Sequence, residues 1–430
     1  MPRKTGFWDD VRSYFREGAD HYQAQNESSE KYSTTATQKA LRSNFGIEPS
    51  QTEVLASDEI TSWTRRSVLR VVRLMAQEHG VEIRGPGGEG AKWIPFRLGE
   101  VVEQVPTDAQ LAFPAGTLAP CPLLVQLQKT SSGQTMHIAY NKADPRAAQL
   151  ASAAMTEIFA RATGVDNPYR NRTVLASRSG EFEVLPDFAD RRSDLVLSEQ
   201  AWGAVDNIHK FLEKLPVLSA AGLSQNRGLL MAGPPGTGKT ALTRIIAGEF
   251  AGDATAVLVE NGVSKYQLTT LYRVVGDLSP AVVLLEDLDL IAGNRQSGDN
   301  TALRELLTVL DGLMTTHKGV VTVASTNDID SIDAAARRAA RFDEILEVPH
   351  PDRIGRRKIL DTYLRRLGVE TIATDRVAGE IRDNLSGADL RLIVNEATLS
   401  DALTTDGLIK TAERIFPKPA GGVDGKEVAA

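Results

Sequence analysis

The chain has 430 residues, of which 42% are hydrophobic and 24% charged, and its formal net charge is −7. This length can hold two or three domains, each with its own core, and the composition is ordinary for a globular protein. The negative balance argues against a generally basic nucleic-acid-binding coat, although a local basic patch is compatible with it. The single cysteine, Cys121, excludes an internal disulfide, fits a reducing compartment, and is expected to be a small buried apolar group.

Membrane and export signals are not visible in the sequence. No apolar run approaches about 20 residues, the length that crosses a bilayer. The start of the chain, Met-Pro-Arg-Lys-Thr, is not followed by the apolar segment of a secretory signal. We therefore expect no membrane span and, by default, a cytoplasmic protein.

Residues 1–45 are predicted to hold a helix and a flexible tether. The helix has an aromatic stripe on one face, made of Phe7, Trp8, Val11, Tyr14 and Phe15. Such a stripe indicates docking on the same protein or on a neighbouring subunit, with a membrane-interface helix as the alternative. Residues 26–38 are rich in Ser, Thr, Glu and Lys without periodicity, which predicts the tether.

Residues 46–165 predict a small mixed α/β domain. A helix is expected from about Asp58 to Glu78, with a core stripe of Val68, Val71, Val72 and Met75. A basic row on the same helix, Arg66, Arg70 and Arg73, could meet phosphates, but a solvated charged face is the favoured interpretation.

The rest of this domain is predicted from turns and alternation. Residues 85–90 are glycine-rich but lack a Lys-Ser/Thr ending, so we expect a loop and not a phosphate site. Two alternating stretches, Leu123–Lys129 and Gln134–Tyr140, predict a hairpin. A helix is expected over Pro145–Ala162, before Gly164.

After a linker at residues 166–194, with one short strand near Thr173–Ala176, strands and helices alternate as in a parallel sheet with crossovers. The larger part of this α/β region spans residues 195–350. A helical appendage is expected over residues 351–416, and a disordered tail over 417–430. The predicted strands are Leu229–Ala232, Ala256–Val259, Val282–Leu285 and Val320–Ala324, and the predicted helices of the appendage are Arg353–Leu367 and Gly387–Leu403.

The most informative stretch is Gly233-Pro234-Pro235-Gly236-Thr237-Gly238-Lys239-Thr240, which matches the phosphate-loop pattern G-x-x-x-x-G-K-[ST] between a strand and a helix. Backbone N–H groups of such a loop surround a polyphosphate, and the helix N-terminus adds its positive dipole end. Lys239 would reach the β- and γ-phosphates, and the Thr240 hydroxyl would bind Mg²⁺. The alternative is an ordinary glycine turn, which the match at all four specified positions in this context disfavours.

Acidic and amide side chains follow the next strands. In Val282–Asp289, one carboxylate should hold Mg²⁺ and the next should activate water, against the alternative of a solvated acidic loop. Asn327 follows the next strand, where an amide can position that water, although a lone Asn there is usually a turn former. Arg338 and Arg341 stand before a further strand and could form surface ion pairs or reach a neighbour's γ-phosphate.

Together these motifs resemble the AAA branch of the AAA+ ATPases, over about residues 194–416. GPPGTGKT resembles Walker A, VVLLEDLD resembles Walker B, Asn327 matches sensor 1, and RRAARFDEILEVPHPD resembles the second homology region. The resemblance implies a P-loop ATPase domain with a helical lid, and trans-acting arginine fingers at Arg338 and Arg341. It also implies ATP contacts at the whole loop, at Ala241, at the adenine-contacting turn Leu195 and Val196, and at Gly387 and Ala388 of the lid motif.

Two departures from the family pattern stand out. Walker B usually ends in Asp-Glu, whereas this chain has Glu286-Asp287, an inversion also found in mitochondrial respiratory-complex assembly ATPases of this branch. By position Glu286 is the metal carboxylate and Asp287, one methylene shorter than glutamate, is the base. Threading ATPases carry an aromatic-apolar-Gly triplet after the second strand, where this chain offers only Tyr266, which we interpret as a packing residue at a helix start.

The sequence therefore predicts Mg²⁺-dependent ATP hydrolysis at subunit interfaces of a homo-oligomer, a ring of six. The ring would remodel or translocate a protein partner bound through the N-terminal region. Two alternatives stay open: a nucleic-acid-associated ATPase that uses the basic row, and an ATP-gated assembly scaffold with slow turnover.

Overall fold

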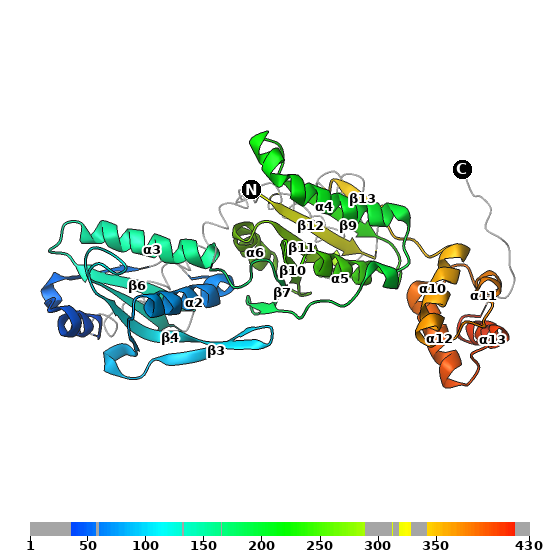
Figure 1. The fold of residues 1–430 in the computed structure, drawn as a ribbon, viewed down its shortest axis with the longest axis horizontal. Coiled ribbons are helices and arrows are strands. Elements are labelled where there is room, and N and C mark those ends of the chain that lie inside the picture. Colours follow the sequence, from blue (N-terminus) through cyan, green and yellow to red (C-terminus); the bar gives the residue numbers. More distant parts are fainter. Residues whose placement is uncertain are drawn as a thin grey trace, which may run out of the picture. The chain divides into compact units, whose positions relative to one another are not determined.

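The computed structural model describes residues 36–56, 60–130, 133–164, 166–288, 312, 318–327 and 342–417. The chain divides into two compact units, residues 1–168 and 169–430 (Figure 1). The predicted aromatic helix at residues 7–15 and nearly all of the predicted tail lie outside the described residues. Within the described residues, no helix is both long and apolar enough to cross a membrane.

The first unit is built on an antiparallel sheet of strands in the order β1-β6-β5-β4-β2, with β3 paired to β4. The predicted hairpin is confirmed, because β5 and β6 pair antiparallel with Lys129 opposite Gln134. The residues predicted as a glycine-rich loop connect β2 to β3. The strand bounds are β1 Thr52–Ala56, β2 Ile83–Arg84, β3 Lys92–Leu98, β4 Val101–Phe113, β5 Leu123–Lys129 and β6 Gln134–Asn141.

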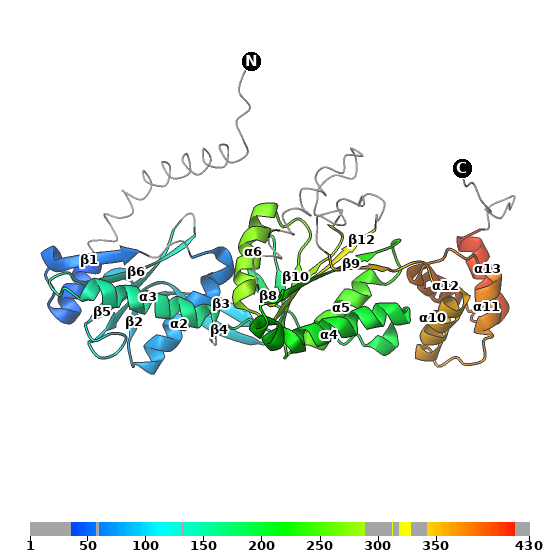
Figure 2. The ribbon, with the colours of Figure 1, turned by 90° about the horizontal axis from the view of Figure 1, so that it is seen from above.

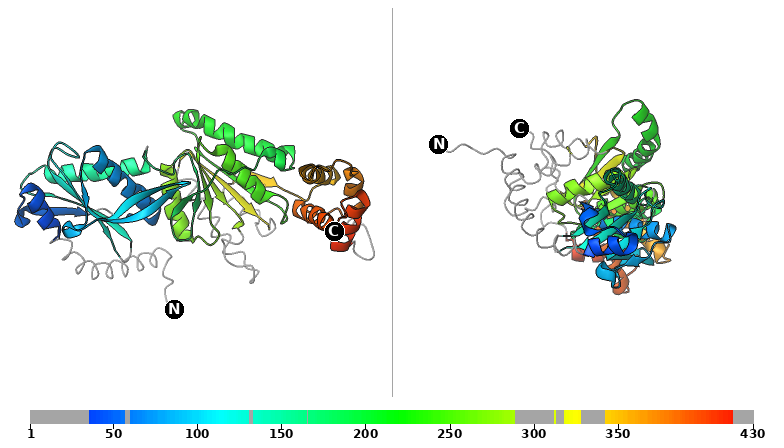
Figure 3. Two further views of the ribbon diagram at one scale, coloured as in Figure 1. Left: turned by 60° about the horizontal axis from the view of Figure 1, so that its bottom comes forward. Right: turned by 90° about the vertical axis from the view of Figure 1, so that its left-hand side faces the viewer.

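Two long helices of this unit, α2 (Ser62–Glu78) and α3 (Ala147–Thr163), pack together beside the sheet (Figure 1). The core stripe predicted for α2 is buried. The helix begins at Ser62 and not near Asp58, because the Thr61 side chain accepts a hydrogen bond from Thr64 N–H and so caps it. Residues 36–45, dark blue in Figure 3, are helical as well, so the predicted flexible tether is wrong for residues 36–38. Leu41 of that helix packs against Leu124 and Ala139.

The basic row of α2 is not the solvated face that the sequence favoured. Arg70 and Arg73 both pair with Glu103 of β4, and their side chains are only 20% and 17% exposed. Arg66 lies over the Phe96 ring, 5.8 Å from its centroid. The row therefore fastens α2 to the β3–β4 hairpin, which also removes the feature that favoured nucleic-acid binding.

The second unit holds a seven-stranded sheet in the order β13-β9-β12-β11-β10-β7-β8. All pairings are parallel except the edge pair β7–β8. The region predicted as a linker thus contributes two strands to this sheet. The short strand predicted near Thr173–Ala176 is confirmed as β7, whereas β8 was not predicted, because short strands carry little pattern before their partners are known. The bounds are β7 Thr173–Ala176, β8 Phe182–Val184, β9 Asn226–Ala232, β10 Thr255–Val259, β11 Ala281–Leu285, β12 Val320–Thr326 and β13 Glu344–Glu347.

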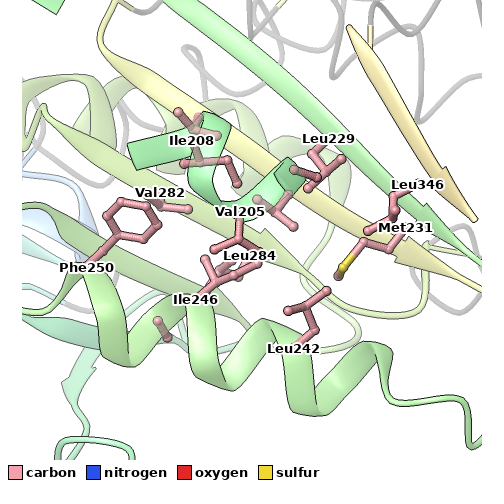
Figure 4. Close-up of a cluster of buried hydrophobic side chains, with 14 of the residues drawn as sticks. Val205, Ile208, Leu229, Met231, Leu242, Ile246, Phe250, Val282, Leu284 and Leu346 are labelled. Carbon is pink, nitrogen blue, oxygen red and sulfur yellow. The ribbon is translucent and has the colours of Figure 1, made fainter. Parts of the chain in front are cut away.

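Helices cover both faces of this sheet (Figure 2). On one face, α4 (Glu199–Ala220) and α5 (Lys239–Phe250) bury a shared apolar cluster in which Val205 and Ile246 meet strand residues such as Leu284 (Figure 4). On the other face lies α6 (Lys265–Asp277), whose Tyr272 hydroxyl is 2.9 Å from Thr322 Oγ1. A sheet buried on both faces explains the near-continuous apolar strands of the sequence.

Four helices form the C-terminal appendage around a separate apolar core. The second predicted helix there ends at Leu399 and not at Leu403, because Asp401 has a left-handed backbone with φ +50°. Arg356, 3% exposed, bonds the carbonyl oxygens of Ala378, Pro351 and Asp383 and so ties the helices together. The bounds are α10 Arg353–Arg366, α11 Thr374–Glu380, α12 Gly387–Leu399 and α13 Thr405–Ile415.

Candidate functional site

The glycine loop connects the end of β9 to the start of α5, as the sequence predicts. Gly236 and Gly238 have φ of +78° and +108°, a conformation that residues with a Cβ rarely adopt. Gly233 must also lack a Cβ, because that atom would lie 2.1 Å from the Val348 carbonyl oxygen. The glycines therefore allow a tight loop that runs into the N-terminus of α5, where free backbone N–H groups favour an anion.

Lys239 is fixed beneath this loop. Its ammonium donates to the carbonyl oxygens of Gly233 and Pro234 at 2.7 and 2.8 Å, and the residue is 5% exposed. Lys239 also lines the cavity described next.

A cavity of about 350 Å³ lies between the loop and the helical appendage. The appendage reaches the loop directly, because Ala388 N–H donates to Gly236 O at 3.2 Å. Of the residues that the sequence assigned to the nucleotide, Gly233 and Pro234 are not part of the wall. Those that line it are Leu195, Val196, Pro235, Gly236, Thr237, Gly238, Lys239, Thr240, Ala241, Gly387 and Ala388.

Several wall residues were missed from the sequence. Ile359, Thr362 and Tyr363 are spaced to share one face of α10, and Arg391 follows from α12. The sequence shows the helical spacing of the three α10 residues, but it does not indicate which face of α10 packs toward the glycine loop. Asp194, also missed, lines the cavity and is tied to the appendage by an ion pair with Arg366 at 2.6 Å. The hydrogen bond from Arg366 lowers the pKa of the Asp194 carboxyl.

The acidic end of the site follows from strand order. β12 lies between β9, which leads into the loop, and β11, which leads into Glu286 and Asp287. Because parallel strands end at the same edge, Asn327 after β12 comes between the loop and the carboxylates. Its Nδ2 donates to Asp287 Oδ1 at 2.9 Å, and both residues line the cavity.

Asp287 has an unusual backbone. Its φ is +47°, and a left-handed conformation in a residue other than glycine is disfavoured by roughly 1–3 kcal/mol. The Asp287 N–H donates to Ser325 Oγ at 3.1 Å. Such strain persists only where neighbouring groups hold it. Here Ser325 of β12 and Asn327, directly after β12, both hydrogen-bond Asp287.

Glu286 does not face Asn327 as Asp287 does, but lies beside the start of α5. The hydroxyls of Thr243 and Thr240 lie near its carboxylate. Burial, and then the nearby Asp287 charge, raise the pKa of Glu286. Its Oε1 is buried and has no hydrogen-bond partner. A buried carboxylate oxygen without a partner is unfavourable unless a cation or a donor completes the site.

The model of the family described as "ATPase family associated with various cellular activities (AAA)" matches residues 229–350, which include the loop, both carboxylates and Asn327. This part of the chain is an AAA ATPase domain. The predicted fold class was a parallel-sheet P-loop ATPase domain with a C-terminal helical lid and a separate small N-terminal α/β domain. It is confirmed by this match together with the parallel sheet, the helices that follow it and the separate first unit.

Relatives of the AAA domain are found among curated proteins. An ATP-dependent zinc metalloprotease FtsH of Trieres chinensis is 31% identical over 272 residues, which are 58% of this chain and 41% of that protein. A proteasome-activating nucleotidase of Aeropyrum pernix is 32% identical over 240 residues, 51% of this chain and 57% of that protein. A "probable inactive" FTSHI 2 metalloprotease of Arabidopsis thaliana is 30% identical over 281 residues, 58% and 32% of the two chains. The chain thus spans less than two thirds of each of these relatives.

The acidic end of the AAA domain fits a magnesium ion. Mg²⁺ is bound by few protein oxygens and completes its shell with water and phosphate. The Thr240 hydroxyl and the partnerless Glu286 Oε1 are oxygen ligands of that kind on adjoining elements. Glu286, and not Asp287, is the carboxylate next to Thr240.

Two kinds of predicted residue are not placed in the site. Arg338 and Arg341 lie outside the described residues. Tyr266 is the second residue of α6, which Ser264 caps by accepting a hydrogen bond from Gln267 N–H. A helix start at Tyr266 is therefore confirmed, while the packing role of its side chain stays a prediction.

The substitution Gly236→Ala should weaken ATP binding. The new Cβ would lie 2.6 Å from Ser386 Oγ and 3.0 Å from Ala388 Cβ, so the loop and the lid must separate. We expect ATP to bind about tenfold more weakly, because the lost contact should cost about as much free energy as one hydrogen bond. Gly222→Ala is the matched control, because Gly222 has φ +67° but open space around it. Fluorescence titration with ATP should separate the two variants, and equal affinities would contradict the loop–lid contact.

Proposed function

We propose that this protein is a Mg²⁺-dependent ATPase whose active sites are completed between subunits of a ring. The observation that carries the proposal is the single cavity that Lys239, Thr240, Asp287, Asn327 and the lid share. A phosphate loop alone would support nucleotide binding. A carboxylate held by an amide at the far end of the same cavity supports hydrolysis.

Each residue has a role that its surroundings support. Lys239 neutralises phosphate charge, because its ammonium lies against the glycine loop and the residue lines the cavity. Thr240 and Glu286 hold Mg²⁺, which supplies charge neutralisation on the phosphates. Asp287 orients the attacking water and takes its proton, with its Oδ1 held by Asn327 Nδ2. Leu195, Val196 and Tyr363 form a mainly apolar part of the cavity wall, which can accept the adenine ring of ATP.

Assembly into a ring, a hexamer by the family resemblance, is part of this proposal. Arg338 and Arg341 would reach the γ-phosphate bound by the neighbouring subunit and neutralise transition-state charge. Hydrolysis would then require neighbouring copies, as expected when each head-to-tail interface of a ring combines the two halves of a site.

A protein is the proposed partner of the ring, bound through the N-terminal unit. The relatives support this, since their names describe a metalloprotease that depends on ATP and a nucleotidase that activates the proteasome. The nucleic-acid alternative loses support because Arg70 and Arg73 are paired with Glu103. DNA that stimulates hydrolysis with a steep salt dependence would restore it.

We expect Lys239→Ala to lose ATP binding by about 100-fold, because truncating a buried, hydrogen-bonded charge partner removes roughly 2–5 kcal/mol. Lys214→Ala, on the exposed side of α4, is the matched control and should bind ATP normally. Calorimetry with ATP and Mg²⁺ measures both variants. ATP binding by Lys239→Ala at wild-type affinity would contradict the proposed site.

The turnover rate separates a motor from a scaffold. Phosphate release from the assembled wild type should be abolished by chelation of Mg²⁺ and should run faster than about 0.01 per second, the rate of a GTPase with its own arginine finger. Slower turnover with normal ATP binding would instead favour an ATP-gated scaffold.

A further inference from the structure

The Glu286-Asp287 order puts the shorter carboxylate in the position proposed for the base. Nevertheless Asp287 lines the cavity and meets Asn327, so some feature of the backbone brings its side chain there. That feature is the left-handed turn at φ +47°, one of three such turns at residues other than glycine among the described residues. A change in φ redirects the Cα–Cβ bond, and with it the carboxylate.

Ser325 is the residue that holds this turn. The parallel ladder between β11 and β12 ends at the pair Leu285 and Ala324. Beyond that pair the Asp287 N–H has left the ladder, and the Ser325 hydroxyl, one residue past Ala324, accepts it at 3.1 Å. Ser325 is 1% exposed, so water is a poor substitute for this acceptor.

We propose that Ser325 is a positioning residue for ATP hydrolysis. It keeps Asp287 in the left-handed conformation that presents the short carboxylate to the cavity and to Asn327. The inference rests on the proposed function, since it assigns Asp287 the base role. Alanine at position 325 would leave the half-buried Asp287 N–H without its side-chain acceptor, and the turn would relax.

Steady-state kinetics on the full chain tests the role of Ser325. Ser325→Ala should lower kcat about tenfold, the effect of one hydrogen bond, with KM for ATP unchanged. Ser325→Thr keeps a hydroxyl and should restore kcat. Ser67→Ala is the matched control, because Ser67 on α2 is also 1% exposed but its hydroxyl makes no hydrogen bond. It should leave kcat at the wild-type value.

A double-mutant cycle shows whether Ser325 acts through Asp287. In an Asp287→Asn background, Ser325→Ala should reduce the residual rate less than about twofold, because coupled residues are not additive. A full further tenfold loss, or a wild-type kcat for Ser325→Ala alone, would overturn the proposal.

A crystal structure of Ser325→Ala gives a readout that needs no activity. We expect φ of Asp287 to leave the left-handed region and the contact with Asn327 to break. A retained turn would overturn the proposal even if the rate fell. A wild type that binds ATP but does not hydrolyse it would instead sink the proposed function, so the two failures are distinguishable.

Discussion

Asp287→Asn should abolish nearly all ATP hydrolysis while leaving ATP binding intact. The amide has the same shape as the carboxylate, and its Oδ1 can still accept from Asn327 Nδ2, so the site should keep its geometry. It cannot take a proton from water, and losing a general base lowers kcat by about 10²- to 10⁴-fold. Single-turnover phosphate release measures the loss, and an ATP titration shows that binding is kept.

Controls decide whether the inverted carboxylates have the roles proposed. Asp253→Asn, at an exposed aspartate after α5, should have wild-type kcat. Glu286→Gln should raise the Mg²⁺ concentration needed for half-maximal turnover, because it removes the carboxylate beside Thr240. If Asp287→Asn altered Mg²⁺ dependence and Glu286→Gln did not, the two assignments would have to be exchanged.

The parts of the fold that sequence predicted well are those in which local chemistry determines structure. The glycine loop needs particular residue types at consecutive positions, and buried strands such as β11 need an apolar run between breaks. Asn327 and Asp287 were both predicted to act on the attacking water although 40 positions separate them, and the structure brings them together because parallel strands end at one edge of a sheet. That inference used topology and no side-chain detail.

Features that depend on a structural partner were missed. Strand β8 was not recognised, since three residues have no pattern apart from β7, their antiparallel partner. Arg70 and Arg73 were interpreted as solvated because Glu103, their partner, lies on a hairpin whose docking the sequence does not reveal. Ser325 gave no signal either, because a serine near a strand end acquires meaning only beside the left-handed backbone of Asp287.

Substitution of Arg341 is the most direct test of an active site that is completed at the subunit boundary. Arg341→Ala should lower kcat by about 10³-fold or more, the effect of removing an arginine finger, with little change in ATP affinity. Arg365→Ala, at an exposed arginine of α10, is the control for loss of a positive charge. Phosphate release and ATP titration on assembled protein give both quantities.

Mixing two inactive variants can distinguish a finger supplied by a neighbour from one supplied in the same chain. Lys239→Ala subunits keep Arg341, and Arg341→Ala subunits keep the phosphate loop. In a mixed ring, some boundaries therefore join an intact loop to an intact arginine, and hydrolysis should return in proportion to those boundaries. If the mixture stays as inactive as its components while gel filtration shows mixed rings, or if dilute monomers hydrolyse ATP as fast as rings, then Arg341 does not act across the boundary. The whole active site would then have to lie within one chain.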